Sequence, residues 1–383
     1  MQSKKIFKII FKVFLVVFIL LIAGVVFINY RLSSYAKLPE GVVRVTNKEE
    51  YYKAIEKAMC NYDEKLTVAI TDMEDDSYYN IDTVEKVLRN NPQLNDICID
   101  AEGNEKVLTI PIEMNIDFKY SEDVKVLKNR EKAVQAKVKE IISKVIKPGM
   151  KDYEKELALH DYLVNNAKYD VRIDKGSMPK ESNTAYGVLI NKLGACVGYS
   201  DAMKRLLDAA NIESKIIVGS VITEENWSGH AWNLVKIGGQ YHHLDVTWDD
   251  PINEDGSNTP RHTYFNISDA QIKKTHQWDE KSYPKCNSTK FNFKNLGLSE
   301  KDGNGNTILT IHNYDEFYST IQQAVVKGKK DVSINILNFN KDVYDLENVV
   351  NKVYRSIGKE GPYSWVEEED DINNSKIITL TFE

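Results

Sequence analysis

The sequence predicts an α+β protein in which a central domain is flanked by two small modules of the same kind. Two observations lead to this prediction. The pattern of residues 47–58 returns in residues 313–324, which indicates an internal repeat. Between the two copies, a helix-like stretch precedes two strand-like runs joined by Gly238-Gly239, which is typical of a β-hairpin. A chain of 383 residues usually forms two or three domains.

The composition is that of an ordinary globular protein. Hydrophobic residues make up 42% and charged residues 28% of the chain. The formal net charge is −7, and acidic and basic residues are interspersed. Binding of nucleic acid requires a basic face, which this sequence lacks, so we expect no nucleic-acid partner.

The amino terminus has the pattern of a membrane anchor. Four lysines between residues 4 and 12 precede an uncharged apolar run from Val13 to Ile28. Extended back over residues 9–11, this run has about the twenty residues that a bilayer-spanning helix needs. We therefore predict a single-pass anchor over residues 1–35, with the amino terminus in the cytoplasm and the remainder outside the cell. A cleaved signal peptide ending near Ala36 is the alternative, and it also predicts export.

Residues 40–117 and 305–383 are predicted to be two copies of one α+β module. Each copy is expected to run strand, helix, strand, helix and two further strands. Neither copy gathers catalytic residue types, so we expect spacers or docking surfaces. Cys60 and Cys98 occur in the first copy only, and both a disulfide and two packed thiols stay open. The matched positions are Tyr52 with Tyr318, Ile55 with Ile321, and residues 66–70 with 332–336.

Cys196 opens a helix-like pattern inside the predicted central domain, residues 118–298. The apolar residues between 202 and 210 fall on one helical stripe, so the cysteine lies at the start of an amphipathic helix. Unpaired backbone amides and the helix dipole lower the pKa of a thiol at such a position. The alternative is a buried cysteine that packs as a small hydrophobic residue.

Gly238-Gly239 joins the strand-like runs 229–237 and 240–248. A two-residue turn there pairs Ile237 with Gln240. Counting back from that pair and applying the two-residue period of a strand predicts which side chains share one face. That set is His230, Trp232, Asp245, Thr247 and Asp249.

His230 then has two carboxylates as diagonal neighbours, Asp245 and Asp249, and the register does not decide between them. An activated nucleophile requires a base that a carboxylate orients. Cys196, His230 and one of these two aspartates therefore predict nucleophilic catalysis.

Three motifs in this chain order resemble the transglutaminase-like superfamily: C-V-G-Y-S at 196–200, G-H-A-W-N at 229–233, and L-D-V-T-W-D-D-P at 244–251. The resemblance extends from about residue 153 to residue 276. It implies a papain-like core with Cys196 as nucleophile, His230 as base and Asp245 as the orienting acid. It also implies that Asp249 and Asp250 either support the triad from outside or are structural. Thr247, on the same face as His230, is another candidate for such support.

The resemblance has one departure, which concerns the oxyanion. Animal transglutaminases have a tryptophan upstream of the cysteine that helps to hold the oxyanion, and no tryptophan precedes Cys196 in this domain. The backbone amide of Cys196 supplies one donor. Asn183 and Tyr186 are candidates for the second donor, and Trp227 and His243 are candidates to line the cleft.

We expect neither a metal nor a cofactor. The calcium-binding loops of the animal enzymes are not visible in the sequence. Other histidines lack the spacing of zinc ligands, so packed or solvated side chains are expected for them. These histidines are His160, His242, His243, His262 and His276.

The predicted chemistry is acyl transfer from an amide of a peptide or protein substrate. Water as acceptor gives a peptidase or amidase, an amine as acceptor gives a transglutaminase, and the sequence does not choose between them. Because the domain is predicted to face outward, peptides of the cell wall or cell surface are the expected substrates. The alternative is a catalytically silent binding or scaffolding module at the cell surface.

Overall fold

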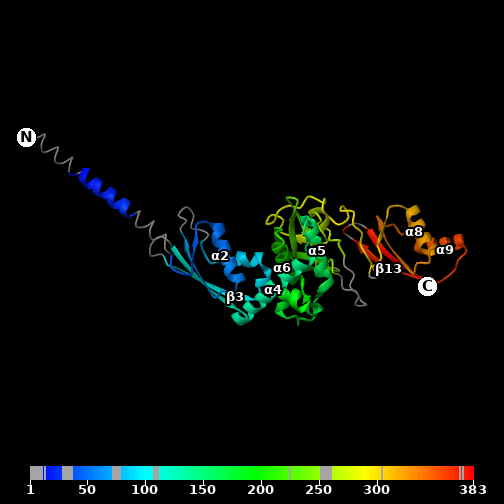
Figure 1. Ribbon diagram of the computed structural model, residues 1–383, viewed down its shortest axis with the longest axis horizontal. Helices are drawn as coiled ribbons and strands as arrows, with labels where there is room; N and C mark the ends of the chain where they lie inside the picture. Colours follow the sequence, from blue (N-terminus) through cyan, green and yellow to red (C-terminus); the bar gives the residue numbers. More distant parts are fainter. Residues whose placement is uncertain are drawn as a thin grey trace, which may run out of the picture. The chain divides into compact units, whose positions relative to one another are not determined.

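The computed structural model describes residues 12, 14–27, 38–70, 79–106, 112–223, 226–250, 261–302, 305–370, 372 and 375–383. The chain divides into two compact units (Figure 1). The first comprises Met1–Val87 and Cys98–Val124, and the second comprises Leu88–Ile97 and Lys125–Glu383. The mixed α+β class expected from the sequence is confirmed. The predicted division into an anchor and three domains stays a prediction.

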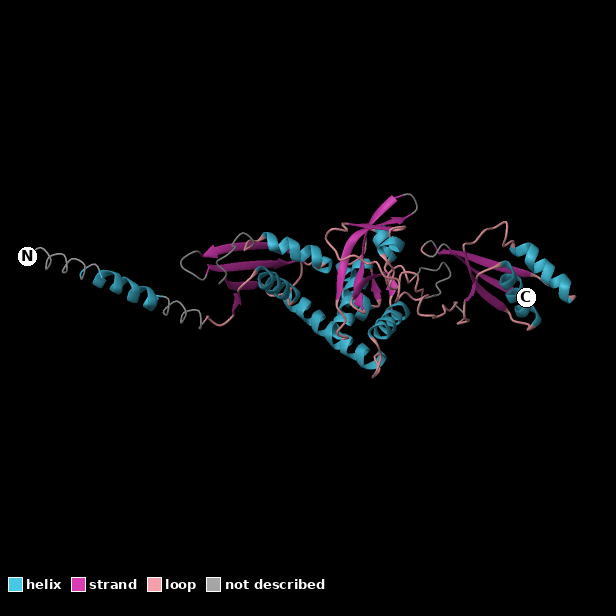
Figure 2. Cartoon of the chain, turned by 90° about the horizontal axis from the view of Figure 1, so that it is seen from above, coloured by secondary structure: helices cyan, strands magenta, loops and turns pink. Residues whose placement is uncertain are grey.

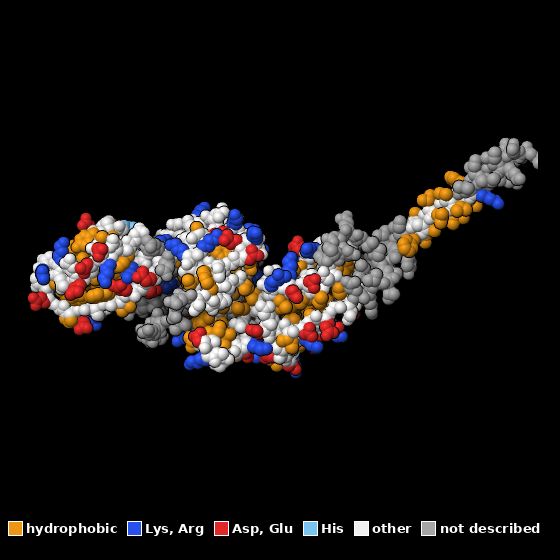
Figure 3. Space-filling view, turned by 180° about the vertical axis from the view of Figure 1, so that it is seen from behind, with side chains coloured by type: hydrophobic (Ala, Val, Ile, Leu, Met, Phe, Trp, Pro, Cys, Tyr) orange, Lys and Arg blue, Asp and Glu red, His pale blue; other side chains and the backbone are white. Residues whose placement is uncertain are grey.

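Residues 14–27 are helical, and their large apolar side chains are exposed (Figure 3). Within the described ranges, no helix combines the length and the apolar character that crossing a membrane takes. The remainder of the predicted anchor, residues 1–11, 13 and 28–35, lies outside the described residues.

The first unit contains a four-stranded sheet of order β1-β2-β4-β3. The strand β1 runs parallel to β2, and the other two pairings are antiparallel. Asn47 caps α2 by accepting the backbone N–H of Glu50, which satisfies one free donor of the first helical turn. The elements are β1 (Val42–Val45), α2 (Lys48–Cys60), β2 (Lys65–Ile70), α3 (Asp82–Asn90), β3 (Cys98–Lys106) and β4 (Ile112–Tyr120).

The carboxyl-terminal segment contains a sheet of the same strand order, β11-β12-β14-β13, with the same parallel and antiparallel pairings. The helices α8 and α9 pack against this sheet, with Phe317 and Val350 in the shared core (Figure 2). Both segments show the element order expected from the sequence, while a common origin for them stays a prediction. The elements are β11 (Leu309–Ile311), α8 (Tyr314–Val326), β12 (Asp331–Leu337), α9 (Leu346–Ile357), β13 (Tyr363–Asp370) and β14 (Ser375–Phe382).

The central part combines helices with a sheet of order β10-β7-β8-β9. Its helices are α4 (Val124–Val145), α5 (Asp152–Asn166), α6 (Cys196–Ala209) and α7 (Asp269–Ile272). Its strands are β5 (Lys168–Tyr169), β6 (Leu193–Gly194), β7 (Ser214–Thr223), β8 (Asn226–Ile237), β9 (Gln240–Leu244) and β10 (His276–Trp278). Short helical turns occupy Pro92–Leu94, Val171–Lys175, Lys180–Asn183 and Gly187–Asn191.

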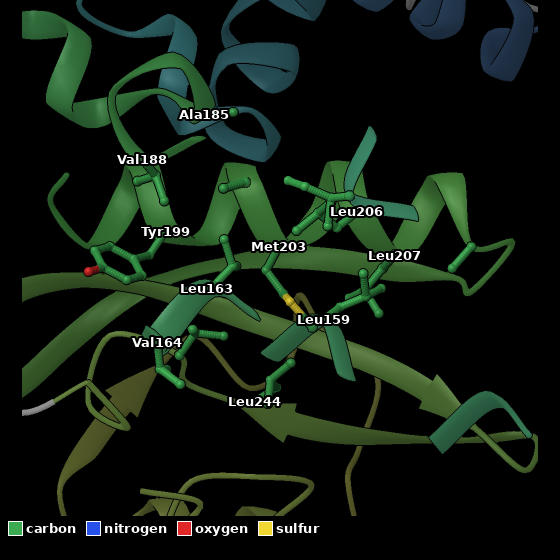
Figure 4. Packing of buried hydrophobic residues seen from close by; sticks show 14 of the residues in the cluster. Leu159, Leu163, Val164, Ala185, Val188, Tyr199, Met203, Leu206, Leu207 and Leu244 are labelled. Carbon is green, nitrogen blue, oxygen red and sulfur yellow. The ribbon is translucent and has the colours of Figure 1, made fainter. Parts of the chain in front are cut away.

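The helices α5 and α6 pack on the central sheet through one apolar core. Leu159 and Leu163 of α5 meet Met203 and Leu207 of α6, and Leu244 of β9 lies below them (Figure 4). These side chains are at most 1% exposed, and full burial of each stabilises the fold by about 1.5–3 kcal/mol. This packing fixes the amino-terminal end of α6 relative to β8.

The hairpin of β8 and β9 has the predicted register. Ile237 pairs with Gln240 across Gly238 and Gly239, whose φ angles of 59° and 83° suit glycine, and pairing continues to Asn233 and Leu244. The predicted strand through residue 248 is wrong, because β9 ends at Leu244 and a turn follows. The carboxylate of Asp245 accepts the backbone N–H groups of the next residues, which competes with the ladder.

None of the four cysteines, Cys60, Cys98, Cys196 and Cys286, forms a disulfide within the part of the chain that the structure describes. For Cys60 and Cys98, the packed-thiol alternative is therefore the one observed.

Candidate active site

Cys196 is the first residue of α6, and Ala195 precedes it as the extended cap residue. The N–H of Ala195 donates to the carbonyl oxygen of Ser182 at 2.8 Å, which holds the approach to the helix. That same carbonyl lies 2.3 Å from where a Cβ on Gly198 would be, so the first turn of α6 requires glycine there. Cys196 itself is 7% exposed.

The thiol of Cys196 forms hydrogen bonds with the side chain of His230 and with the backbone of Ala231. Burial alone would raise the pKa of this thiol. The hydrogen bond from His230 and its positive charge outweigh burial, and the pKa of Cys196 lies below its ordinary value. The pair therefore favours the thiolate.

His230 is bound on its other side by Asp245. The distance from His230 Nε2 to Asp245 Oδ2 is 2.6 Å, and both side chains are buried, which leaves Nδ1 of the ring for the thiol. Burial would lower the pKa of His230, but the charge of Asp245 and its hydrogen bond raise it to about 10. Burial would likewise raise the pKa of Asp245, and His230 holds it well below its usual range. The three side chains thus form a thiolate–imidazolium–carboxylate series.

A second histidine shares this carboxylate. His276 Nε2 lies 2.9 Å from Oδ2 of Asp245, and the N–H groups of Thr247 and Trp248 donate to Oδ1 at 3.0 and 3.1 Å. Burial lowers the pKa of His276, so its ring is neutral and donates Nε2–H. Nδ1 of that ring lies 2.8 Å from the Thr275 hydroxyl. Asp245 is therefore held by four donors.

His276 was missed as a site residue by sequence reasoning. It lies on the short strand β10, which pairs with β7 and not with the predicted hairpin. Its separation from Asp245 is 31 residues, and no local pattern links the two. The one available signal was that a polar histidine sits in a strand-like stretch that ends in Trp278.

Residues 139–246, which include Cys196, His230 and Asp245, match the family model of the transglutaminase-like superfamily. The chain contains a transglutaminase-like domain. Kyphoscoliosis peptidase of Mus musculus is 24% identical over 123 residues, which cover 30% of this chain and 18% of that protein. Kyphoscoliosis peptidase of Homo sapiens is 22% identical over 143 residues, or 35% of this chain and 21% of that protein.

The chain thus spans about a fifth of the length of these curated relatives. A solved structure described as a TGase is 13% identical, with a TM-score of 0.28. That likeness covers 56% of this chain and 61% of the other.

The two sequence candidates for the second oxyanion donor of the transglutaminase-like domain are engaged elsewhere. The side-chain amide of Asn183 donates to Asp96 Oδ2 at 2.9 Å. The ring of Tyr186 packs on the central core and faces the guanidinium of Arg130 at 5.5 Å. Neither side chain has a hydrogen bond to Cys196 within the described part of the chain, so the structure does not support either assignment.

The two predicted cleft residues lie in different surroundings. His243 is fully buried, accepts the indole N–H of Trp232 at 2.9 Å and faces Asp269 at 2.8 Å, so it lines no open cleft. Trp227 lies on β8 opposite Ile222 and is 47% exposed, so its side chain is free to meet a substrate.

The aspartates after β9 have separate roles. Asp249 Oδ2 lies 3.1 Å from Nε2 of His160, and Oδ1 accepts the N–H of Tyr264, so Asp249 does not face His230. The choice that the register left open therefore falls on Asp245. Asp250 accepts the hydroxyl of Tyr199 at 2.5 Å. Thr247 acts through its backbone N–H on Asp245, as support from outside the triad.

Three groups of side chains in the described ranges bring metal-ligand types together, and the ligand atoms of each group lie within 4.8 Å. One group is the triad carboxylate with its two histidines. The groups are His230 with Asp245 and His276, His243 with Asp269 and Cys286, and His160 with Asp161 and His262.

In the two groups outside the triad, hydrogen bonds explain why side chains of metal-ligand types lie close together. In the second, Trp232 donates to Nδ1 of His243, so Nε2 carries the proton and is not a ligand. In the third, every ring nitrogen of His160 and His262 faces a carboxylate oxygen. The expectation that no metal is needed stays a prediction.

Proposed function

We propose that this protein is a cysteine-dependent acyl-transfer enzyme that acts on amide bonds of peptides or proteins. One observation carries the proposal: the Cys196 thiol at the start of α6 hydrogen-bonds to His230, whose other nitrogen lies 2.6 Å from Asp245. This arrangement supplies a nucleophile, a base and an orienting carboxylate in one buried cluster. The match of residues 139–246 to the transglutaminase-like superfamily supports it.

The geometry implies a two-step reaction. The Cys196 thiolate attacks the amide carbon, and the C–S bond forms as the carbonyl oxygen becomes an oxyanion. The imidazolium of His230 then gives its proton to the nitrogen, the C–N bond breaks, and an amine leaves a thioester behind. In the second step, His230 takes a proton from the acceptor, which attacks the thioester and restores the thiolate.

Water and an amine compete as acceptors in that second step. Both curated relatives are named peptidases, which supports water as the acceptor here. We therefore propose hydrolysis as the main outcome, with transfer to an amine as the second. Mass spectrometry of products formed from a glutamine-containing peptide, with and without a primary amine, separates the two outcomes.

The first test is the rate of Cys196 alkylation by iodoacetamide as a function of pH. Wild-type protein should react well below the pH of about 8.5 at which a free thiol titrates. His230→Ala should lose this low-pH reactivity, while His242→Ala, a buried histidine bonded to the Ser288 carbonyl, should keep it. Cys196→Ser gives the background from the other thiols. A wild-type profile like that of an ordinary thiol would refute the proposal and favour the binding module.

We also propose that the protein is anchored in the membrane with its catalytic domain outside the cell, where peptides of the wall or surface are its substrates. The support is the lysine-flanked apolar run of residues 13–28. A membrane-impermeant maleimide should label a cysteine introduced at Ser299 in intact cells, and one introduced at Ser3 only after lysis. Labelling of both positions only after lysis would contradict this location.

A further inference from the structure

An acyl transfer at Cys196 needs two donors for the oxyanion, and one is in place. The N–H of Cys196 is the first of α6, where a helix leaves its amides without internal partners. Stabilisation of the oxyanion depends on donors fixed before the reaction starts. The amide of Asn183 is bound to Asp96 and the ring of Tyr186 faces Arg130, so another element is the better source of the second donor.

The short strand β5 runs beside the residues that lead into Cys196. Tyr169 pairs with Gly194 in a parallel ladder with β6. The N–H of Lys168 donates to Lys192 at 3.1 Å, and the N–H of Asp170 donates to Gly194 at 2.9 Å. The backbone of Tyr169 is thereby fixed beside Gly194, which precedes the nucleophile Cys196 by two residues.

Side chains next to these two strands reinforce this pairing. The carboxylate of Asp170 accepts two hydrogen bonds from the guanidinium of Arg172 at 2.7 Å each. It also accepts the hydroxyl of Ser182 at 2.6 Å, and the carbonyl of Ser182 in turn accepts the N–H of Ala195. One network therefore ties the residue after Tyr169 to the residue before Cys196.

The hydroxyl of Tyr169 lies in the electric field of the reacting groups. Its ring packs against the central core and is partly exposed. Burial raises the pKa of this hydroxyl most, and the next cause is the charge of Cys196, with a smaller effect from Asp245. The group therefore stays protonated, and among the described residues it makes no hydrogen bond of its own.

We propose that the hydroxyl of Tyr169 is the second oxyanion donor, opposite the N–H of Cys196. The inference rests on the proposed acyl transfer at this thiol. As the thiolate adds to the carbonyl, the O–H of Tyr169 donates to the oxygen that gains charge, and no proton leaves the hydroxyl. A phenolic O–H here does what the missing tryptophan N–H does in animal transglutaminases.

Two reactions of the Cys196 thiol distinguish a donor to the oxyanion from a residue that acts on the thiol itself. Iodoacetamide alkylates Cys196 by displacement, without an oxyanion, whereas p-nitrophenyl acetate acylates it through a tetrahedral oxyanion. In Tyr169→Phe, the pH profile of alkylation should stay as in wild type. Acylation, followed as a burst of p-nitrophenolate, should slow by about 10²-fold, the effect of removing one such donor.

Matched variants make the comparison decisive. Phenylalanine keeps the ring of Tyr169 in the core, and thermal unfolding of the variant checks that the fold is retained. Tyr186→Phe, which removes a hydroxyl from a tyrosine bound elsewhere, should leave both reactions unchanged.

Each other outcome overturns the inference. Equal acylation in Tyr169→Phe and wild type would refute the donor role while the proposed function stands. A shift of the alkylation profile equal to the loss in acylation would show that Tyr169 acts on the thiol and not on the oxyanion. A wild-type alkylation profile like that of a free thiol would overturn the proposed function, and this inference with it.

Discussion

His276 Nε2 lies 2.9 Å from the same carboxylate oxygen of Asp245 that binds His230 at 2.6 Å. The side chain of His276 is fully buried and its ring is in edge contact with Trp232, at 5.0 Å between ring centroids. Asp245 is thus held by a second histidine, whose two ring nitrogens face Asp245 and Thr275. This relationship makes His276 a positioning residue for the proposed triad.

Replacement of His276 should weaken the triad without removing it. In His276→Ala, Oδ2 of Asp245 loses one donor, the carboxylate is held less firmly, and low-pH alkylation of Cys196 should slow by about 10-fold. His276→Gln, whose amide can donate in place of Nε2–H, should recover part of this loss. Iodoacetamide rates between pH 5 and 10 give the measurement. Equal profiles for all three proteins would contradict the positioning role.

The pH dependence of the reaction follows from the two perturbed groups. Because the pKa of Cys196 is lowered, the rate should rise below the pH at which an ordinary thiol ionises. Because the pKa of His230 is about 10, the rate should fall again near pH 10. In Asp245→Asn, the charge that holds His230 protonated is gone, so the fall should move to lower pH. The rate at neutral pH should drop by about 10²–10⁴-fold.

Steady-state rates on a peptide substrate check this prediction, because departure of the amine requires the proton of His230. Asp249→Asn is the matched control, because that carboxylate faces His160 and not His230. An unshifted alkaline limb in Asp245→Asn would show that another group sets the pKa of His230.

Glu156 and Asn266 form a buried pair in which the carboxyl group is neutral. The amide of Asn266 donates to Glu156 Oε2 at 2.6 Å, while Glu156 Oε1 and Asn266 Oδ1 have no hydrogen-bond partner among the described residues. Burial raises the pKa of Glu156 to about 8. A protonated carboxyl can donate Oε1–H to Oδ1, which pairs both remaining atoms.

The sign of the pH effect follows from this raised pKa. The contribution of Glu156 to stability is complete below its unfolded pKa of about 4.3 and is lost as the pH rises through about 8. Glu156→Gln removes this titration. The free energy of unfolding of the variant, relative to that of wild type, should therefore be about 1–3 kcal/mol larger at pH 9 than at pH 5. Thermal unfolding at both pH values measures the gain, and a difference that does not change with pH would contradict it.

The sequence located those parts of the site that depend on local pattern. The helical stripe after Cys196 and the Gly238-Gly239 turn are short-range signals, and the structure has both the helix and the register to Leu244. Alternation failed beyond Leu244 because Asp245 binds the backbone of its own turn. Only the folded structure therefore shows that Asp245, and not Asp249, binds His230.

The remaining site residues depend on contacts that are distant in sequence. Asn183 is near Cys196 in the chain, yet its amide partner Asp96 is 87 residues away. Tyr169 comes beside Cys196 through the pairing of two strands that are only two residues long, and such strands have no periodicity to detect. His276 approaches Asp245 through a strand outside the predicted hairpin.

The close approach of Gly198 to Ser182 gives a last test of how the nucleophile is placed. A Cβ at residue 198 would lie 2.3 Å from the carbonyl oxygen of Ser182 and 3.1 Å from that of Thr184, both of which are backbone atoms. Gly198→Ala should therefore move the first turn of α6, destabilise the fold by about 1–3 kcal/mol and slow the alkylation of Cys196. Gly229→Ala, on β8 with no heavy atom of the other described residues within 4 Å of its added Cβ, should be tolerated. Chemical denaturation and iodoacetamide rates measure both effects. If Gly198→Ala kept the stability and the rate of wild type, this approach would not be what places Cys196.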